Sequence, residues 1–319
     1  MKGKVCVFGS FNFDVVATLP RFPLPGESLV AKRSMMGPGG KGANQATAAA
    51  RAGARVHYIG KVGNDEFGKT ARRSLEQAGF DVLTLFVSRD APTGNALIYV
   101  AGKNAENMIA VDPGANLTVS EQEVNQCLPA LAAADLLLTQ LENNLGAIEK
   151  MIDVARRNNT YIILNPAPYQ PVPERLLAEV DLLTPNATEA GQMTGITVDD
   201  RSTALCAAAL LHRRGAKNVI ITLGIQGALL SETQGQAWIP CFPARPLDST
   251  GAGDAFNGAL AARLAAGESL REAALFAAAY AAVCVERAGA AASMPSLEET
   301  VARLNQYPDI QIEALAPTA

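Results

Sequence analysis

The sequence predicts a three-layer α/β fold, in which helices cover both faces of a central and mostly parallel β-sheet. Short apolar runs alternate with stretches of helical periodicity over most of the 319 residues, and this alternation is typical of parallel sheets. The apolar runs are continuous, as expected of strands that are buried on both faces. The chain is also long enough to bury an ample core.

Six strands of this sheet are expected from short apolar runs. They are residues 5–10, 56–62, 135–141, 161–165, 181–184 and 219–223. Helical periodicity predicts five helices between the strands and three more after residue 254. These helices are expected over residues 43–52, 66–78, 120–132, 145–157, 203–214, 255–266, 270–287 and 297–305. Gly53, Gly79 and Gly215 each follow one of the first helices, where glycine commonly ends a helix.

Two segments, residues 11–36 and 93–112, interrupt the alternation. The second contains two short strand patterns, 95–101 and 107–112, around the turn Gly102-Lys103-Asn104. A hairpin inside such a series predicts a small separate sheet, which acts as a lid over the ligand or as an edge for dimerisation. A surface excursion without function is the alternative. We expect residues 1–319 to form a single domain with this lid, and the polar tail from about residue 306 to be peripheral.

The composition argues against several classes of partner. The net charge is 27 − 31 = −4, so neither nucleic acid nor an anionic membrane surface is an expected partner. The five cysteines are scattered and never form a C-x-x-C pair, which favours reduced thiols in a cytoplasmic protein. No apolar run reaches transmembrane length, and no signal-peptide pattern opens the chain. With two histidines, a histidine-based metal site or catalytic triad is not expected.

The most informative motif is DSTGAGDAFNG, from Asp248 to Gly258. The small residues Gly251-Ala252-Gly253 precede a long helical pattern, so the opening N–H groups of that helix would face a ligand. Such a helix end favours an anion, above all a phosphate. The carboxylate of Asp254 would repel this phosphate unless it accepts a proton from the group that attacks it. The motif therefore indicates a kinase.

Polar residues follow the expected strands at their carboxyl ends, where ligands collect in parallel sheets. Asn12 and Asp14 follow the first strand and, being two residues apart in extended chain, share one side. Further acids, amides and hydroxyls follow the other strands. They are Gln140, Glu142, Asn165, Thr184, Asn186 and Thr222. Each could also be an ordinary strand or turn cap, but their recurrence at one edge predicts a common site.

A second glycine-rich turn, residues 37–45, feeds the first helix. It satisfies the letters of G-x-G-x-x-G, yet no apolar strand precedes it and no acid lies about twenty residues on, so a dinucleotide site is not indicated. It is no phosphate-binding P-loop either, because Lys41 is followed by Gly42 rather than serine or threonine. Backbone N–H groups together with Lys41 and Asn44 would instead suit the hydroxyls of a sugar.

The run Asn186-Ala187-Thr188-Glu189 has two interpretations that are compatible with each other. In the first, Asn186 caps a helix and Glu189 completes a capping box. In the second, Glu189 lies near a Mg²⁺ and contacts it through water, since Mg²⁺ keeps much of its hydration.

These motifs resemble those of the ribokinase-like carbohydrate kinases of the phosphofructokinase B type, and within them the ribokinases. The resemblance runs from about Lys4 to Asn305, with the hallmarks GGKGANQ at 39–45 and DSTGAGD at 248–254. It implies the ribokinase-like α/β/α fold with a β-sheet lid that pairs in a homodimer. It also implies transfer of the γ-phosphoryl group of ATP to a sugar hydroxyl, most simply O5 of D-ribose, with Mg²⁺ and K⁺ as cofactors.

The resemblance implies roles for individual residues. The catalytic set is the base Asp254 with the anion hole Gly251, Ala252 and Gly253. The sugar-binding positions are Asn12, Asp14, Gly39, Gly40, Lys41, Asn44 and Glu142. The nucleotide-binding positions are Asn186, Thr222, Leu223, Gly224, Gly227 and Gly253. The K⁺ positions, several of them through backbone carbonyls, are Asp248, Thr250, Cys284, Arg287, Gly289 and Ser293.

Three other functions remain open at this stage. A sibling kinase would act on deoxyribose, another sugar or a nucleoside. A non-catalytic sugar-binding protein could use the same fold, but the intact Asp254 and its two neighbouring glycines argue against it. A dehydrogenase is disfavoured by the context of the first glycine-rich turn. Ala278 stands where the ribokinases often carry an asparagine near the adenine, which leaves the nucleotide preference open.

Overall fold

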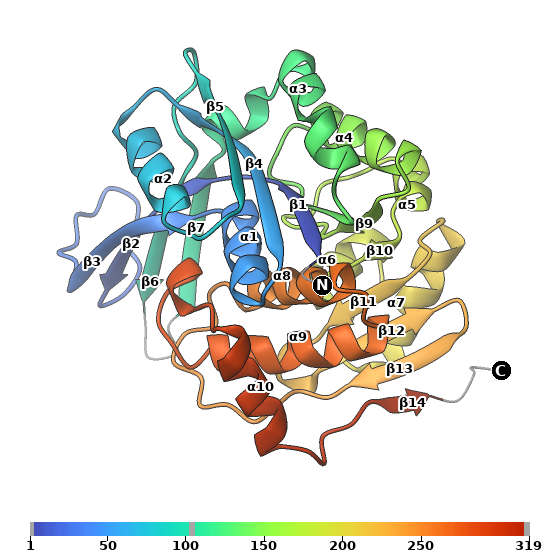
Figure 1. Ribbon diagram of the computed structural model, residues 1–319. Helices are drawn as coiled ribbons and strands as arrows, with labels where there is room; N and C mark the ends of the chain where they lie inside the picture. The colour runs from blue at the N-terminus through green and yellow to red at the C-terminus, as the bar shows by residue number, and fades with distance from the viewer. Residues whose placement is uncertain (1–2, 102–105, 316–319) are drawn as a thin grey trace.

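The computed structural model describes residues 3–101 and 106–315. Its central sheet has ten strands in the order β14-β13-β12-β11-β10-β9-β8-β1-β4-β5, of which the seven from β11 to β5 run parallel. Figure 1 shows this sheet running from β5 at the upper left to β14 at the lower right. The strands are β1 (Lys4–Phe8), β4 (Arg55–Gly63), β5 (Val82–Ser88), β8 (Leu136–Thr139), β9 (Tyr161–Leu164), β10 (Leu182–Leu183), β11 (Val219–Thr222), β12 (Ala228–Glu232), β13 (Gly235–Ile239) and β14 (Glu313–Leu315).

Helices cover both faces of the sheet, and each face has its own apolar core. One core holds Val5 and Val7 of β1, and the other holds Cys6 and Phe8, because successive side chains of a strand point to opposite faces. The first face carries α1 (Lys41–Arg51), α2 (Glu66–Glu76), α8 (Ala252–Ala265), α9 (Leu270–Cys284) and α10 (Leu297–Gln306). The second carries α3 (Glu121–Ala132), α4 (Leu145–Arg157), α5 (Glu174–Glu179), α6 (Ala187–Thr194) and α7 (Arg201–Arg213).

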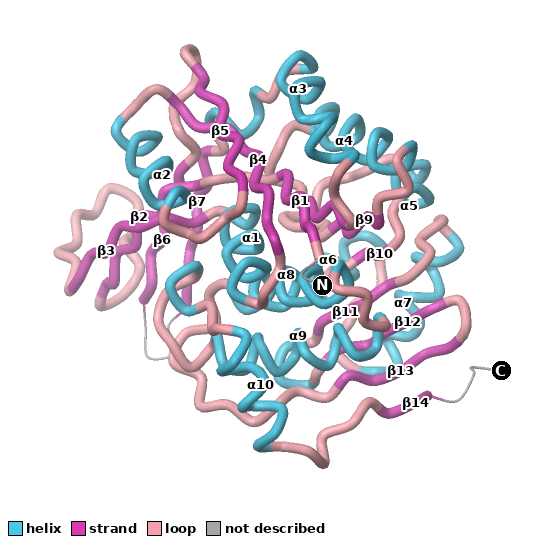
Figure 2. The backbone as a smooth tube through the Cα atoms, in the orientation of Figure 1, coloured by secondary structure: helices cyan, strands magenta, loops and turns pink. Residues whose placement is uncertain are grey.

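A second sheet of four strands, which we call the lid sheet, stands apart from the central one, at the left of Figures 1 and 2. Its order is β3-β2-β6-β7, and only the β2–β6 pair is parallel. The strands are β2 (Asn12–Leu19), β3 (Arg33–Gly39), β6 (Asn95–Ala101) and β7 (Glu106–Asp112). Phe13 of β2 stacks on Phe67 of α2 with ring centroids 4.3 Å apart, which joins the lid sheet to the helical layer.

The expected three-layer fold, its six strands and its eight helices are confirmed, with ends that move by a few residues. The stop glycines Gly53, Gly79 and Gly215 all have positive φ. The expected hairpin is present as β6 and β7, but its turn Gly102-Lys103-Asn104 lies outside the described residues.

Several elements were not predicted. They are β2, β3, β5, β12, β13, α5 and the edge strand β14, which lies within the tail expected to be peripheral. The strand β3 carries exposed charged and methionine side chains, so it lacks the apolar run used to find the others. Within residues 3–101 and 106–315, every helix is too short or too polar to cross a membrane.

Candidate active site

The carboxylate of Asp254 lies in the first turn of α8 and is 7% exposed. Its Oδ2 accepts a hydrogen bond from Asn44 Nδ2 at 2.9 Å, and its Oδ1 accepts one from Gln45 Nε2 at 3.0 Å. Both donors come from α1, which packs against α8. The two glycine-rich motifs of the sequence therefore meet at Asp254, and each oxygen of its carboxylate accepts a hydrogen bond from α1.

The N-terminus of α8, where the sequence predicts an anion seat, has the backbone geometry that such a seat needs. The helix begins at Ala252, and its N-cap Gly251 has φ +77°, a left-handed conformation that glycine adopts without strain. A Cβ at Gly253 would meet no described atom within 4 Å, so there is open space in front of this turn. First-turn N–H groups of a helix have no partner within the helix, and the helix dipole adds partial positive charge there.

The positions at which sugar binding is expected lie near Asp254. Asp14 and Gly39 lie on the neighbouring strands β2 and β3, and a Cβ at residue 39 would stand 2.1 Å from Asp14 Oδ2. A Cβ at Gly40, whose φ is +91°, would stand 2.6 Å from the backbone nitrogen of Asn12. Asn12 is buried, and its Oδ1 accepts a hydrogen bond from Asn116 Nδ2 at 2.9 Å. Asn12 thus supports the wall that Asp14 lines.

Glu142 and Lys41 complete this wall. Glu142 Oε2 accepts the backbone N–H of Lys41 at 2.9 Å and the hydroxyl of Ser10. Burial lowers the pKa of Lys41, but the carboxylates of Asp254, Glu142 and Glu189 more than compensate, so the net pKa is raised. The ammonium of Lys41 is therefore a stable positive charge among acids.

Burial and neighbouring carboxylates raise the pKa of two acids at this wall, Asp14 and Glu142. Burial, with the nearby charges of Glu142 and Asp254, raises the pKa of Asp14 from 3.8 to about 7. Burial also raises the pKa of Glu142, although Lys41 and the hydroxyl of Ser10 act in the opposite direction. With three acids and one lysine, this part of the site favours neutral hydroxyls over an anionic group.

A cavity of about 750 Å³ opens on the other side of the anion seat. Ser249, Ala252 and Gly253 line it beside α8, and Asn186 and Thr222, which form a β-bridge, line it beside α6. The remaining expected nucleotide positions Leu223, Gly224 and Gly227 also line it. One wall of this cavity is apolar. It is formed by residues of α8, of α9 and of the segments next to them, namely Phe242, Phe256, Ala278, Ala281, Ala282 and Val285. A flat apolar ring with a charged tail would fit this shape.

Glu189 and Asn186 form the expected capping box of α6. Asn186 Oδ1 accepts from the N–H of Glu189 at 2.8 Å, and Glu189 Oε2 accepts from the N–H of Asn186 at 2.8 Å. Glu189 is 8% exposed, and burial raises its pKa despite the hydrogen bond from Asn186 and the charge of Lys41. The capping interpretation is therefore confirmed, and the carboxylate also lies within the electric field of Lys41 and Asp254.

The six expected K⁺ positions lie on two segments, residues 248–250 before α8 and residues 284–293 from the last residue of α9 onward. Asp248 joins these segments, because its Oδ1 accepts the N–H of Thr250 and its Oδ2 that of Gly289, both at 2.9 Å. Partial burial alone would raise the pKa of Asp248, but these N–H groups hold it below its ordinary value. The guanidinium of Arg287 is paired with Glu299 and, being cationic with no acceptor atom, cannot bind a cation. Only the backbone carbonyl of Arg287 could serve an ion.

The side chains of Cys284 and Ser293 are turned toward each other, with Sγ and Oγ 3.0 Å apart, and the Ser293 hydroxyl donates to Ala290 O at 2.7 Å. Burial raises the pKa of the Cys284 thiol. A neutral thiol is a poor ligand for a hard cation, so the backbone carbonyl of Cys284 is the group that could serve one.

Two buried polar residues near Asp254, Gln45 and Asn257, were given no role from the sequence. They join Gln140, Asn165 and Thr184, which the strand-end pattern placed at the common site, in a continuous set of hydrogen bonds that includes the backbone carbonyl of Thr184. The sequence does contain an indication for Gln45, which stands among small apolar residues of an expected helix. A glutamine there must be either exposed to solvent or hydrogen-bonded inside the protein. The sequence could not decide between these two options.

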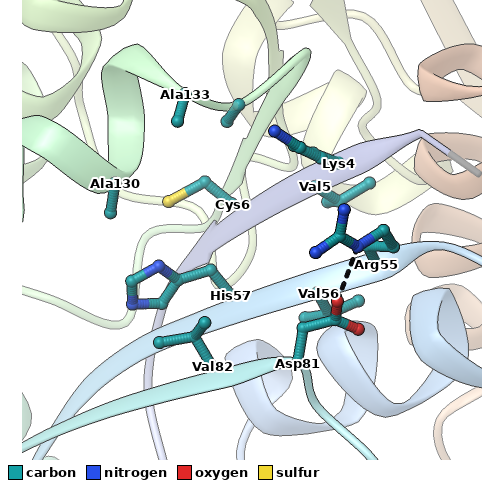
Figure 3. A pocket seen from close by; sticks show the side chains of 11 residues that line it. Lys4, Val5, Cys6, Arg55, Val56, His57, Asp81, Val82, Ala130 and Ala133 are labelled. Carbon is teal, nitrogen blue, oxygen red and sulfur yellow. Dashed lines mark hydrogen bonds and ion pairs between the residues drawn. The ribbon is translucent and has the colours of Figure 1, made fainter.

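A smaller hollow of about 180 Å³ lies at the amino ends of β1, β4 and β5 (Figure 3). The guanidinium of Arg55 is paired there with Asp81 at 2.7 Å. Amino ends of parallel strands lie at the edge opposite to their carboxyl ends, so this hollow is remote from Asp254. We assign the reaction to the carboxyl edge.

Comparisons with known proteins agree with this geometry. A model described as pfkB family carbohydrate kinase matches residues 2–297. A ribokinase of Haemophilus influenzae is 40% identical over 301 residues, which are 94% of this chain and 98% of the relative. A deoxyribokinase of Salmonella typhimurium is 32% identical over 304 residues, which are 95% of this chain and 98% of the relative.

Solved structures of ribokinases are also similar to this chain over almost its whole length. Ribokinase from Arabidopsis thaliana, complexed with ribose and ATP, superposes with a TM-score of 0.87 and 30% identity, covering 95% of this chain and 99% of that one. Ribokinase from Thermotoga maritima gives a TM-score of 0.85 and 33% identity, covering 96% of this chain and 100% of that one.

Proposed function

The chain belongs to the pfkB family of carbohydrate kinases, and on that premise we propose that it transfers the γ-phosphoryl group of ATP to O5 of D-ribose. One observation carries the proposal: the buried carboxylate of Asp254, in the first turn of α8, lies beside the wall of Asp14, Asn44 and Glu142, and the same end of α8 opens on a large cavity. A sugar on one side and a nucleotide on the other would bring the reacting groups together at this carboxylate.

The sugar wall suits vicinal hydroxyls. Asn44 donates to Asp254 through Nδ2, while its buried Oδ1 has no hydrogen-bond partner among residues 3–101 and 106–315. A buried acceptor without a partner is costly, so a sugar hydroxyl that donates to Asn44 Oδ1 would remove this cost. Asp14, whose carboxylate lies against Gly39, would accept a hydrogen bond from a second hydroxyl.

We infer the reaction from these positions. Asp254 accepts the proton of the attacking hydroxyl as the new O–P bond forms, while the bond between the γ-phosphorus and the β–γ bridging oxygen of ATP breaks and ADP leaves. The first-turn N–H groups of α8 would stabilise the charge on the transferred phosphoryl group. Lys41 adds a positive charge on the sugar side. Because the transition state is loose, positioning and charge stabilisation contribute more than basicity does.

The residues also fit the two expected cations. Glu189, buried near Lys41 and Asp254, would hold Mg²⁺ through water, and this ion would neutralise phosphate charge. Asp248 would hold K⁺ with backbone carbonyls of Thr250, Cys284, Arg287, Gly289 and Ser293, because each Asp248 oxygen accepts one N–H and keeps further lone pairs.

We further propose that residues 1–319 act as one cytoplasmic kinase domain and that the lid sheet pairs with a second copy. Apolar side chains on the face of the lid sheet opposite to Asp14 support this pairing. Met36, Leu97, Tyr99 and Met108 lie in facing register there, with 42–69% of each exposed. The face of Asp14 also carries exposed apolar side chains, namely Met35, Ile109 and Val111, so the lid sheet has exposed apolar surface on both faces, and such surface favours association.

A deoxyribose kinase is the second candidate, since a deoxyribokinase is among the relatives. The test is ATP consumption with ribose, deoxyribose, fructose, adenosine and pseudouridine, with K⁺ present or absent. We expect the highest kcat/KM with ribose and higher activity with K⁺. Higher kcat/KM with deoxyribose would favour the second candidate, and no turnover with any of the five would contradict the proposed substrate class.

A further inference from the structure

A series of buried amides runs behind the carboxylate of Asp254. Gln45 Nε2 donates to Asp254 Oδ1 and also to Asn165 Oδ1, at 3.0 Å in both cases. Gln45 Oε1 accepts from Gln140 Nε2 at 2.7 Å. Gln45 and Gln140 are fully buried. Gln45 thus makes three hydrogen bonds inside the protein, and one of them reaches the proposed base.

The series continues across the sheet and returns to α8. Asn165 Nδ2 donates to the carbonyl of Thr184 at 2.8 Å, and Thr184 Oγ1 donates to Asn257 Oδ1 at 2.6 Å. Asn257 Nδ2 then donates to the carbonyl of Gly253 at 2.9 Å. That carbonyl belongs to the peptide group that carries the N–H of Asp254. One connected set therefore holds both the carboxylate and the first-turn backbone of the anion seat.

We propose that this amide series positions Asp254 for phosphoryl transfer and that Gln45 is its central positioning residue. The inference rests on the proposed role of Asp254 as the proton acceptor. Asn44 holds only one oxygen of the carboxylate, so rotation of the carboxylate is fixed only when Gln45 holds the other. The Oδ1 of Asn44, which has no hydrogen-bond partner among the described residues, would also bind the proposed sugar. The three hydrogen bonds of Gln45 are all to other protein side chains, so they need not change when a sugar binds.

The direction of the Gln45 amide is determined by its neighbours. Its nitrogen faces the carboxylate of Asp254, and its oxygen faces the NH₂ group of Gln140. A reversed amide would place acceptor against acceptor and donor against donor. A fixed donor of this kind costs no reorganisation at the moment of reaction, which is the condition for electrostatic preorganisation.

A double-mutant cycle tests the proposal. Gln45→Met keeps the side-chain length and removes the amide, and we expect kcat to fall roughly 10- to 100-fold with the KM of sugar and ATP nearly unchanged. In the Asp254→Asn background the same substitution should change kcat by less than about threefold, because the group being positioned is already lost. Equal falls in the two backgrounds would show that Gln45 acts through general stability and would overturn the proposal.

A control and a second cycle accompany this test. Gln236→Met makes the same chemical change on β13, where Gln236 pairs with Leu315 of the edge strand β14, and kcat should be unchanged. Should Gln45→Met not fold, Thr184→Val decides, because it is nearly isosteric and removes the bond to Asn257. If Thr184→Val lowers kcat in the otherwise unaltered protein but not in the Asp254→Asn background, the result supports the proposed role of the amide series. If Thr184→Val leaves kcat unchanged in both, the proposal is overturned. A near-normal kcat in Asp254→Asn alone would instead contradict the proposed base.

Discussion

The carboxylate of Asp14 lies so close to the backbone of Gly39 that a Cβ at residue 39 would stand 2.1, 2.4 and 2.5 Å from its three terminal atoms. The two residues come from adjacent strands of the lid sheet, where Gly39 is paired with Asn12. The position of the Asp14 carboxylate therefore requires a glycine at residue 39. A single methyl group there would displace this carboxylate from its place near Asp254.

Gly39→Ala should lower kcat/KM for the sugar by roughly 10²-fold, while the KM of ATP changes little because the nucleotide cavity does not include residue 39. Steady-state kinetics with each substrate varied in turn measures this. Gly37→Ala is the matched control, since a Cβ at Gly37 would meet no described atom within 4 Å. Equal effects of the two substitutions would contradict the role assigned to the contact with Asp14.

Gly253→Ala should impair the reaction without impairing the fold. Its Cβ would enter the open space in front of α8, where the phosphoryl group is expected, so kcat should fall by roughly 10²-fold. Alanine favours a helix over glycine by up to about 1 kcal/mol, so Tm should stay the same or rise. Kinetics and thermal unfolding of one preparation check both parts, and a lower Tm with normal kcat would contradict the anion seat.

Asp254→Asn should lower kcat by roughly 10²–10⁴-fold with the KM of both substrates little changed. The amide keeps the size of the side chain but cannot accept the proton of the attacking hydroxyl. Direct binding of ATP and sugar, followed by calorimetry, shows whether the site remains assembled. Normal kcat in a variant that binds both substrates would rule out Asp254 as the base.

Asp14 should make sugar binding depend on pH. Its pKa is about 7 in the folded protein, so below pH 7 the carboxylate is protonated and binds hydroxyls less well. We expect kcat/KM for the sugar to fall as pH drops from 8 to 6. In Asp14→Asn this pH dependence should flatten and the KM of the sugar should rise roughly 10- to 100-fold.

The same acid should reduce stability above neutral pH. Between its ordinary pKa of 3.8 and about 7, the folded protein binds the proton of Asp14 while the unfolded chain has released it. Stability from this group therefore falls as pH rises through that interval. Asp14→Asn should raise Tm at pH 8 and have little effect near pH 4. A higher Tm at pH 4 only would contradict the assignment.

The proposed dimer is tested by the double variant Leu97→Glu with Met108→Glu. These two side chains are exposed on the face of the lid sheet opposite to Asp14. Two charges there should convert a dimer into a monomer, as light scattering on a sizing column would show. Val301→Glu, at an exposed position of α10, should leave the oligomeric state unchanged. A monomeric unaltered protein would refute the pairing.

Much of the central fold follows from local signals. The continuous apolar runs of β1, β4 and β8 to β11 and the helices between them were predicted because burial on both faces imposes a composition. The strands β3 and β14 were missed, because each is an edge strand with exposed side chains and no such composition. Edge strands form through backbone pairing with a neighbour, which a local sequence pattern does not record.

The sequence by itself determined the family motifs, the glycine turn from Gly251 to Gly253 at a helix start and the presence of one acid beside it. Local backbone chemistry is sufficient for this, since glycine turns and helix starts are encoded over a few residues. Only the tertiary structure decided that Gln45 and Asn44 hold the two oxygens of Asp254. Those contacts join residues more than two hundred positions apart, and they exist only once α1 has packed on α8.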